Sequence, residues 1–270
     1  MRTDHTDEHK LLASRVSDYL RLAERGELAC GSFLTPEEAR YVTLVLQEKR
    51  AATKGVLFGG YEDAERRRLF VLPDFLSDMD GEPYDKLREY FPDELSSAVK
   101  AIRIKGSGFR ELSHRDYLGA LLALGIERCS MGDIVVEDKH SAIVFCTDKI
   151  FDFLMVGIDR IGADKVTVEE FCPTPDFSPT RESMPIRDTV ASNRLDCVVG
   201  ALTNLSREKA QTLIKSGLCE VDYLAEQRVD FELKHLPCTL TLRGYGKYRV
   251  ISFDGETKRG RLRLVAEKYV

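Results

Sequence analysis

The sequence lacks closely spaced cysteines. Its seven cysteines lie at positions 30, 129, 146, 172, 197, 219 and 238, and no two are closer than 17 residues. This spacing excludes zinc ribbons and redox Cys-x-x-Cys sites. The odd number of thiols and the absence of a secretory signal predict a reduced, cytoplasmic protein. Most cysteines are expected to be small core residues, and neither a bound metal nor a cofactor is expected.

Long apolar runs are also missing. No stretch approaches the roughly 18 apolar residues of a membrane-spanning helix, so no membrane contact is expected. The chain has 270 residues, of which 43% are hydrophobic and 31% are charged. This composition is typical of a globular protein, and the length favours about two domains.

The motifs of RNA-modifying enzymes are incomplete. Gly106-Ser107-Gly108 follows a predicted strand but has no third glycine, so it is not the cofactor loop of a methyltransferase. Arg194-Leu195-Asp196 is superficially similar to the catalytic Arg-Leu-Asp of pseudouridine synthases. The following residues, Cys197-Val198-Val199-Gly200, lack the Thr-Ser-Gly continuation. We therefore predict a protein without catalytic residues, and a pseudouridine synthase-like enzyme is the alternative.

Charge is unevenly distributed along the chain. Residues 1–180 contain 24 Lys and Arg against 33 Asp and Glu, whereas residues 181–270 contain 16 against 12. The two net charges, −9 and +4, add to the formal net charge of −5. The basic last third is therefore the part expected to bind a polyanion. An adaptor role, in which the acidic N-terminal part binds a protein partner, is compatible with this.

The last third of the chain begins with two predicted helices. Within 191–202, apolar residues recur at the spacing of one helix face, at Leu195, Val198, Val199 and Leu202. Ser206 is a suitable N-cap for the second helix, because its hydroxyl can accept from an unpaired amide of the first turn. Gly217 is a suitable residue to end that helix.

The second helix is predicted to present a basic surface. Arg207, Gln211 and Lys215 are four residues apart and form one stripe, with Lys209 on the opposite flank. The N-terminal amides and the positive dipole end of the helix favour an anion beside Arg207. These features together predict contacts with a phosphate backbone.

A glycine-containing hairpin is predicted after the helices. Strands are expected over 218–221, 236–242 and 248–253, and the last two flank Gly244 and Gly246. Glycines at this position let a ligand approach the backbone closely. The charges here are supplied by Arg243, Lys247 and Arg249, and Tyr245 and Tyr248 can either stack on an unpaired base or pack.

This ordered set resembles the S4-like RNA-binding domain. The resemblance is carried by Ser192-x-Arg194-Leu195-Asp196, Ser206-Arg207-x-x-Ala210, Ile214-x-x-Gly217-x-x-x-Val221 and Leu242-Arg243-Gly244-x-Gly246-x-Tyr248. It departs from the family at Val221-Asp222-Tyr223, where many members have Val-Asn-Gly. The resemblance implies RNA contacts at Arg194, Arg207, Lys209, Arg243 and Lys247. The full predicted RNA-binding set is Arg194, Ser206, Arg207, Lys209, Gln211, Lys215, Arg243, Tyr245, Lys247 and Arg249.

The N-terminal region is predicted to be α+β. A helix is expected within 1–26 and another after Thr35-Pro36, where Thr is the N-cap and Pro the first helical residue. Short strands are expected over 55–59 and 68–72. The intervening Arg66-Arg67-Arg68 is interpreted as a solvated surface turn in preference to a nucleic-acid contact. Residues 73–83 are rich in turn formers and predict a boundary.

The middle of the chain has the order of a ferredoxin-like sandwich. Strands are expected over 101–105, 133–137, 142–146 and 165–169, and helices over 113–124 and 148–160, which gives βαββαβ. RNA-recognition modules share this order, but their aromatic strand signature is missing here. A role as a scaffold or protein contact is therefore as compatible with the sequence as base stacking.

The most specific phrase runs from Ser113 to Ile126, as SHRDYLGALLALGI, and continues in Gly132-Asp133-Ile134. With the C-terminal module and the helical N-terminal region, it resembles the YlmH family of bacterial S4-domain proteins. The resemblance implies a cytoplasmic RNA-binding protein associated with the large ribosomal subunit. It further implies contacts with ribosomal RNA and tRNA during translation or the rescue of stalled ribosomes, that is, ribosome-associated quality control.

The predicted fold class is α+β. We expect an N-terminal α+β domain over 1–80, a ferredoxin-like (RRM-like) central domain over 81–171, a proline-rich linker over 172–185 and an S4-like RNA-binding domain over 186–270.

Overall fold

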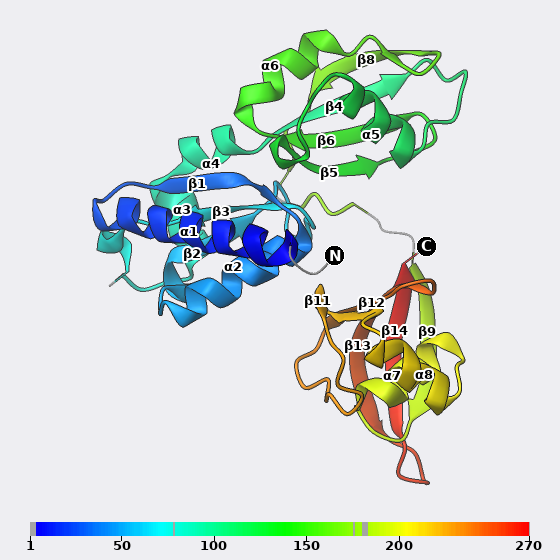
Figure 1. The fold of residues 1–270 in the computed structure, drawn as a ribbon. Coiled ribbons are helices and arrows are strands. Elements are labelled where there is room, and N and C mark those ends of the chain that lie inside the picture. Colours follow the sequence, from blue (N-terminus) through cyan, green and yellow to red (C-terminus); the bar gives the residue numbers. More distant parts are fainter. Residues whose placement is uncertain (1–3, 78, 175, 180–182, 270) are drawn as a thin grey trace. The chain divides into compact units, whose positions relative to one another are not determined.

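The computed structural model describes residues 4–77, 79–174, 176–179 and 183–269. Contacts within the chain divide it into two units, Met1–Pro179 and Thr180–Val270. In the described residues the fold is mixed α and β, with eight α-helices and three antiparallel sheets (Figure 1). The finer predicted division, at residues 80, 171 and 185, stays a prediction. Short 3-10 turns lie at Ala52–Lys54, Asp74–Leu76 and Arg128–Ser130.

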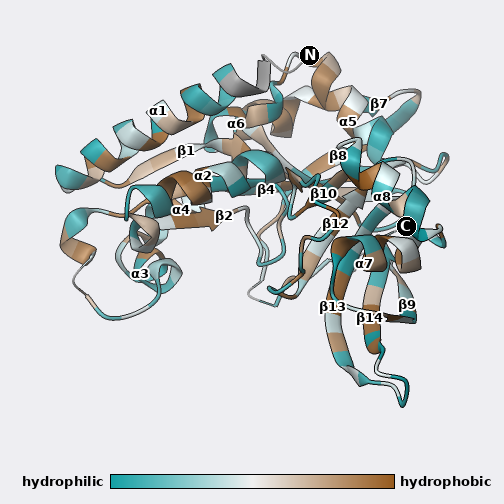
Figure 2. Ribbon diagram, turned by 60° about the horizontal axis from the view of Figure 1, so that its bottom comes forward, coloured by the Kyte–Doolittle hydropathy of each residue, from teal (hydrophilic) through white to brown (hydrophobic). Residues whose placement is uncertain are grey.

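The first sheet has the strand order β1 (Ala29–Leu34), β3 (Arg67–Val71), β2 (Gly55–Phe58). Helices α1 (Asp4–Glu24) and α2 (Pro36–Glu48) pack against one face. The helix predicted within 1–26 is thus confirmed, and Figure 2 shows hydrophilic and hydrophobic residues alternating along it, as expected for a helix with one buried face.

Helix α2 begins as its sequence predicts. Thr35 Oγ1 accepts from the Glu38 amide (3.2 Å), and Glu38 Oε2 accepts from the Thr35 amide (2.6 Å). This reciprocal pair is a capping box, and Pro36 occupies the first helical position. The prediction of the helix start at Thr35-Pro36 is confirmed.

The opposite face of the first sheet is covered by two short helices, α3 (Pro83–Tyr90) and α4 (Pro92–Ala98). Because side chains alternate along a strand, Phe70 and Leu72 point to this side while Leu69 and Val71 point toward α1 and α2. The first sheet is therefore buried on both faces.

The second sheet has the order β5 (Met131–Val136), β6 (Ser141–Cys146), β4 (Lys100–Gly106), β8 (Asp164–Glu170), β7 (Arg160–Ile161). The predicted alternation of strands and helices is present along the chain. Every pairing in the sheet is antiparallel, and β4 lies between β6 and β8.

Helices α5 (His114–Ala123) and α6 (Asp148–Gly157) pack on one face of the second sheet around Ile102, Tyr117 and Leu154. The predicted helix over 148–160 is too long, because the chain leaves the helix after Gly157 and Arg160 starts strand β7. Ser113, the first residue of the helix predicted over 113–124, caps α5 in a box with Asp116. His114 is exposed at the start of this helix.

The interpretation of Arg66-Arg67-Arg68 as a solvated turn is wrong. Arg68 is 8% exposed, and its guanidinium donates to the carbonyls of Gly31 and Ala98. Arg66 donates to the carbonyls of Met131 (2.9 Å) and Arg128 (2.9 Å). Backbone carbonyls from other elements therefore satisfy these charges, and the segment joins the first sheet to the second instead of facing solvent.

The second unit contains one six-stranded sheet. Its strands follow the order β11 (Leu224–Ala225), β10 (Cys219–Val221), β12 (Cys238–Leu242), β13 (Gly246–Glu256), β14 (Leu262–Tyr269), β9 (Ser183–Val190). Strand β9 starts at Ser183, so its pairing with β14 begins within the linker predicted over 172–185. Strand β14 has no counterpart among the predicted strands.

Helices α7 (Leu195–Thr203) and α8 (Arg207–Lys215) cover one face of this sheet (Figure 1). The first helix starts at Leu195, later than the predicted 191, and it ends at Asn204, whose left-handed backbone (φ 56°) reverses the chain. Ser206 and Gly217 delimit the second helix as predicted.

Candidate nucleic-acid interface

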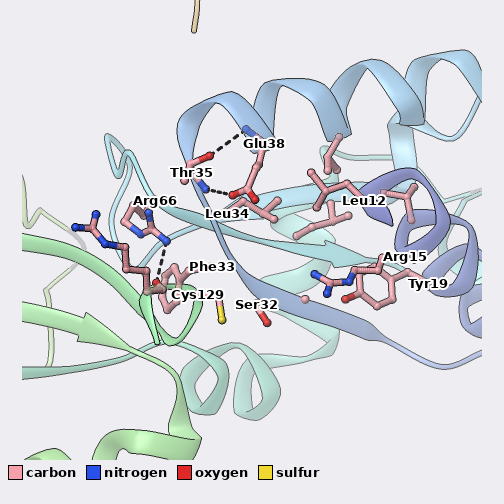
Figure 3. A pocket seen from close by; sticks show the side chains of 15 residues that line it. Leu12, Arg15, Tyr19, Ser32, Phe33, Leu34, Thr35, Glu38, Arg66 and Cys129 are labelled. Carbon is pink, nitrogen blue, oxygen red and sulfur yellow. Dashed lines mark hydrogen bonds between the residues drawn. The ribbon is translucent and has the colours of Figure 1, made fainter. Parts of the chain in front are cut away.

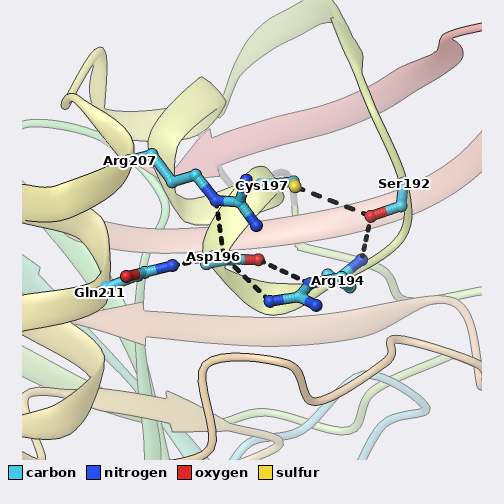
Figure 4. Close-up of polar contacts among 6 residues, drawn as sticks. All are labelled: Ser192, Arg194, Asp196, Cys197, Arg207 and Gln211. Atoms are coloured by element: carbon cyan, nitrogen blue, oxygen red, sulfur yellow. Dashed lines mark hydrogen bonds and ion pairs between the residues drawn. The ribbon is translucent and has the colours of Figure 1, made fainter.

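A buried carboxylate organises the basic residues at the start of the two helices of the second unit. The Asp196 side chain is 0% exposed, in the first turn of α7. Arg194 Nε and Arg207 Nε donate to its two oxygens at 3.1 Å, and Gln211 Nε2 donates to Oδ2 at 2.9 Å. Figure 4 shows these three side chains converging on Asp196 from α8 and from the residue that precedes α7. We call these four residues the Asp196 cluster.

The Asp196 cluster carries a net positive charge. Burial alone would raise the pKa of Asp196, but hydrogen bonds from Arg194, Gln211 and Arg207 outweigh it and hold this pKa well below its usual range. The carboxylate is therefore ionised at neutral pH, and one negative charge faces two guanidinium groups. Arg207 keeps 65% of its side chain exposed. Since a guanidinium has five N–H donors, Arg207 retains donors for an outside acceptor.

The start of α8 adds amides to this charge. Ser206 is the N-cap, and its hydroxyl accepts from the Lys209 amide at 3.4 Å. The remaining first-turn amides and the positive end of the helix dipole lie beside Arg207. Lys209 and Lys215 are exposed on the same helix. An anion placed at this end of α8 would meet both backbone and guanidinium donors.

The β12–β13 hairpin lies at the other end of α8. The Arg243 amide donates to the Leu218 carbonyl (2.9 Å), which connects the hairpin to the segment just after α8. The loop Arg243-Gly244-Tyr245 is closed by the Tyr245 amide on the Leu242 carbonyl (2.9 Å). Gly244 and Gly246 have φ of 88° and 123°, values that a side chain would strain. Arg243 and Tyr245 are exposed at this tip.

Two of the predicted residues lie on the opposite side of the sheet. Tyr248 is buried against the helices, so its neighbours Lys247 and Arg249 point away from α7 and α8. The Lys247 ammonium lies over the Tyr223 ring (4.8 Å) and near the Tyr269 ring (5.7 Å). The structure therefore brings Arg194, Arg207 and Gln211 together, but it places Lys247 and Arg249 on a different face.

The turn that departs from the S4-like pattern keeps the geometry of a two-residue hairpin. Asp222 and Tyr223 both have positive φ, 47° and 67°, between the paired residues Val221 and Leu224. Asn-Gly is the usual choice for such a turn, so Tyr223 stands in an unfavourable backbone conformation. Asp222 compensates in part, because its Oδ1 accepts from the Thr239 amide at 2.9 Å.

Sequence reasoning missed the role of Asp196. From the sequence, Asp196 is interpreted only as part of an incomplete catalytic motif. Its basic neighbours in the two predicted helices are the signal that indicates a charge cluster. Within the described residues, no group of three or more His, Cys, Asp or Glu side chains is placed to hold a metal ion. Burial raises the pKa of the thiols of Cys146, Cys219 and Cys238 to about 12, which leaves them unreactive core residues.

The second sheet does not offer the open face on which RNA-recognition modules stack bases. Phe145, on the face opposite α5 and α6, is 0% exposed and packs with Phe33 and Tyr61 of the preceding region. Tyr61 Oη donates to Asp133 at 2.7 Å and so holds this cover in place. Any nucleic acid bound by this part of the chain must use its edges and loops.

Comparisons with known proteins bear on both units. Residues 92–174, which run from α4 to just beyond β8, match a family model described as "Putative RNA-binding domain in YlmH". The chain is 28% identical over 248 residues to "Ribosome-associated protein quality control protein P2" of Bacillus subtilis (strain 168), across 91% of this chain and 89% of that protein. A solved structure, "Cell division protein ylmH from Streptococcus pneumoniae", aligns with 16% identity and a TM-score of 0.44 over 61% of this chain and 91% of that chain.

These matches support the YlmH family for this chain. The resemblance carried by Ser113–Ile126 and Gly132-Asp133-Ile134 is confirmed, since both phrases lie within the matched segment. The family model describes the first unit's second sheet as the RNA-binding part, whereas the predicted contact residues all lie in the second unit. No helix in the described ranges has the length and apolar character of a membrane span.

Proposed function

We propose that this protein is a cytoplasmic RNA-binding protein without catalytic activity that associates with the ribosome. The observation that carries the proposal is the Asp196 cluster, in which a buried carboxylate holds two arginines in place beside the free amides of a helix start. Arginines fixed in advance bind phosphate at a lower entropic cost than mobile ones. Large-subunit ribosomal RNA is the proposed ligand, with tRNA as a second one.

The place of action is proposed from the relative. A protein of similar length is named for ribosome-associated quality control, and it aligns with nine tenths of this chain. We therefore propose that the chain acts in translation on stalled ribosomes. Its acidic N-terminal part would contact a protein partner, because residues 1–180 carry a net charge of −9, which discourages indiscriminate binding of polyanions.

The finer fold assignments are part of this proposal. The strand order β8-β4-β6-β5 with two helices on one face supports a ferredoxin-like sandwich for the second sheet. In the second unit, the helix pair α7 and α8 followed by the β12–β13 hairpin supports an S4-like domain. RNA would then meet two modules of one chain.

The environment of Asp196 supports the absence of pseudouridine synthase chemistry at this position. A catalytic aspartate must reach its substrate, whereas the Asp196 side chain is buried and accepts from Arg194, Arg207 and Gln211. Opening the cluster to admit a base would break four charge-assisted hydrogen bonds.

The proposal is tested by sedimentation of the full-length protein with separated ribosomal subunits at moderate salt. We expect the wild type to move with the large subunit and an Arg207→Ala, Lys247→Ala double variant to stay at the top of the gradient. The matched control is Lys258→Ala, Arg259→Ala, which removes the same charge from the exposed turn between β13 and β14. A wild type that stays at the top with both subunits would refute ribosome association.

A further inference from the structure

The first unit contains a cavity that the proposed RNA contacts of the second unit do not use. It measures about 220 Å³ and lies between α1, β1 and α2, with Arg128 and Cys129 at its edge. Figure 3 shows Arg15 and Tyr19 on one side of it and Arg66 with Cys129 on the other. Pockets for drug-sized ligands are usually about 300–1,000 Å³, so this smaller cavity suits a group the size of one base, with the rest of a nucleotide at its mouth.

The charge around the cavity is positive. Three arginines line it, Arg15, Arg66 and Arg128, against the single carboxylate of Glu38. Glu38 is already engaged by the amide of Thr35 in the capping box. Throughout the residues that the structure describes, the guanidinium groups of Arg15 and Arg128 form no ion pair. Both are exposed, and an anion entering the cavity would be their first charged partner.

The remaining wall is apolar. It is formed by one face of each neighbouring element, namely Leu12, Val16, Phe33, Leu34, Val42 and Leu69. Tyr19 adds a ring that lies directly on Gly31, where a Cβ would come within 3.2 Å of the phenol oxygen. An apolar wall with guanidinium groups on two sides of the cavity fits a ligand with an aromatic body and an anionic group.

The strand that floors the cavity is irregular at this point. The pairing of β1 with β3 shifts register between Cys30 and Phe33, so Ser32 is exposed while Phe33 and Leu34 are both buried. Arg68 accommodates the irregularity by donating to the Gly31 carbonyl at 2.6 Å. Bulges of this kind occur often beside binding sites, where they redirect side chains.

We propose that this cavity binds a single nucleotide, with the base against the apolar wall and the phosphate on Arg15. This proposal rests on the proposed RNA-binding function. It makes the cavity a second RNA contact, in addition to the one proposed in the second unit. Arg128 and Cys129 lie in the segment that matches the RNA-binding family model, next to the edge strand β5. The other face of that sheet is closed by Phe33 and Tyr61, so an RNA strand at its edge would reach the mouth of the cavity. The ligand is therefore an unpaired nucleotide of RNA, with a free nucleoside monophosphate as the second source of the same chemistry.

The test uses the full-length protein and isothermal titration with the four nucleoside 5′-monophosphates, inorganic phosphate and a single-stranded tetraribonucleotide. We expect the nucleotides to bind more tightly than phosphate, because phosphate cannot use the apolar wall. Arg15→Gln should weaken nucleotide binding about tenfold, since it removes a charge-assisted hydrogen bond. Ser32→Trp should abolish it by filling the cavity. Arg21→Gln, on the same helix but outside the cavity, is the control and should bind as the wild type does.

The outcomes separate the two ligand sources and the two proposals. If the tetranucleotide binds more tightly than any mononucleotide, and Ser32→Trp loses this gain in affinity, the natural ligand of the cavity is a nucleotide of RNA. Equal affinities would identify free nucleotides as the ligand and overturn the RNA assignment. No binding of any nucleotide, or unchanged binding in both Arg15→Gln and Ser32→Trp, overturns the pocket. The Arg207→Ala, Lys247→Ala variant should bind mononucleotides normally. A wild type that binds nucleotides but does not move with either ribosomal subunit would refute the ribosome proposal alone. Thermal unfolding checks that each variant is folded. If Ser32→Trp does not fold, nucleotide binding by Arg15→Gln alone decides whether the cavity is the binding site.

Discussion

Arg207 Nε lies 3.1 Å from Oδ2 of Asp196, and the two side chains differ sharply in exposure: 65% for the arginine and 0% for the aspartate. The fully buried Asp196 carboxylate thus fixes the position of the largely exposed Arg207 side chain. The arrangement places a cation at the surface without leaving its position to the flexibility of a long side chain. It explains why an acidic residue lies at the centre of a site proposed to bind a polyanion.

Asp196→Asn should weaken RNA binding even though it makes the protein more positive. The change removes the charge that holds Arg194 and Arg207, and it weakens the hydrogen bonds that they make. We expect the free energy of unfolding to fall by about 1–3 kcal/mol and the RNA affinity to fall with it. Urea unfolding and RNA binding at fixed salt measure the two quantities. An increase in affinity would show that Asp196 acts mainly by repelling phosphate.

The contribution of Asp196 to stability should depend on pH in the acid range. The folded pKa of this carboxyl lies below its unfolded value, which is about 3.9 for aspartate. Its contribution is therefore complete above the unfolded pKa and is lost as the pH falls toward the folded one. The difference in unfolding free energy between wild type and Asp196→Asn should be constant from pH 7 to about pH 5 and should shrink below about pH 4. A difference that stays constant to pH 3 would contradict this.

The salt dependence of RNA binding should identify the face that is used. A site that engages roughly five phosphates predicts a slope of log affinity against log salt of about −4 to −5. Arg207→Ala should make the slope shallower by about one on any RNA ligand. Because Lys247 lies on the other side of the sheet, Lys247→Ala should do the same only on an RNA long enough to reach both faces. An unchanged slope for both variants would remove them from the interface.

Asp133 should be important for the stability of the first unit. Its carboxylate accepts from Tyr61 Oη (2.7 Å) and from the amides of Glu65 (2.7 Å) and Arg66 (2.9 Å). Asp133→Asn leaves these donors with a neutral partner that also presents an N–H group, so we expect a loss of about 3 kcal/mol. Urea unfolding measures the loss, and Asp152→Asn on the exposed side of α6 is the control. Equal stability of the two variants would show that the contact is dispensable.

Local signals predicted the elements well. Helices start at Thr35, Ser113 and Ser206 because each side chain can accept a hydrogen bond from the first turn of the helix. The formation of such a cap depends only on the few residues that follow. The same is true of the positive-φ glycines at Gly217 and Gly244. Such features depend on a few consecutive residues, so the sequence alone is sufficient to find them.

Contacts between distant elements were not predictable in this way. Arg68 is buried because carbonyls of Gly31 and Ala98 surround it, and these residues lie more than 25 positions away. Likewise, Lys247 and Arg207 both belong to the predicted RNA-binding set. The direction of Lys247 depends on which neighbour fills the core, and Tyr248 does so. The predicted set of contact residues is therefore divided between two faces, a result that required the packing of the whole sheet.

The hydrogen bonds to Asp133 also govern how this protein can be dissected. The segment that matches the RNA-binding family model starts at residue 92, whereas the groups held by Asp133 belong to residues 61–66. A fragment cut at residue 92 would expose Phe145 and leave this carboxylate without its partners. The exposed apolar face of its sheet would bind nonspecifically to other molecules in a binding assay. A fragment of residues 1–179 is the whole first unit and keeps Phe145 covered, so its RNA affinity would be informative.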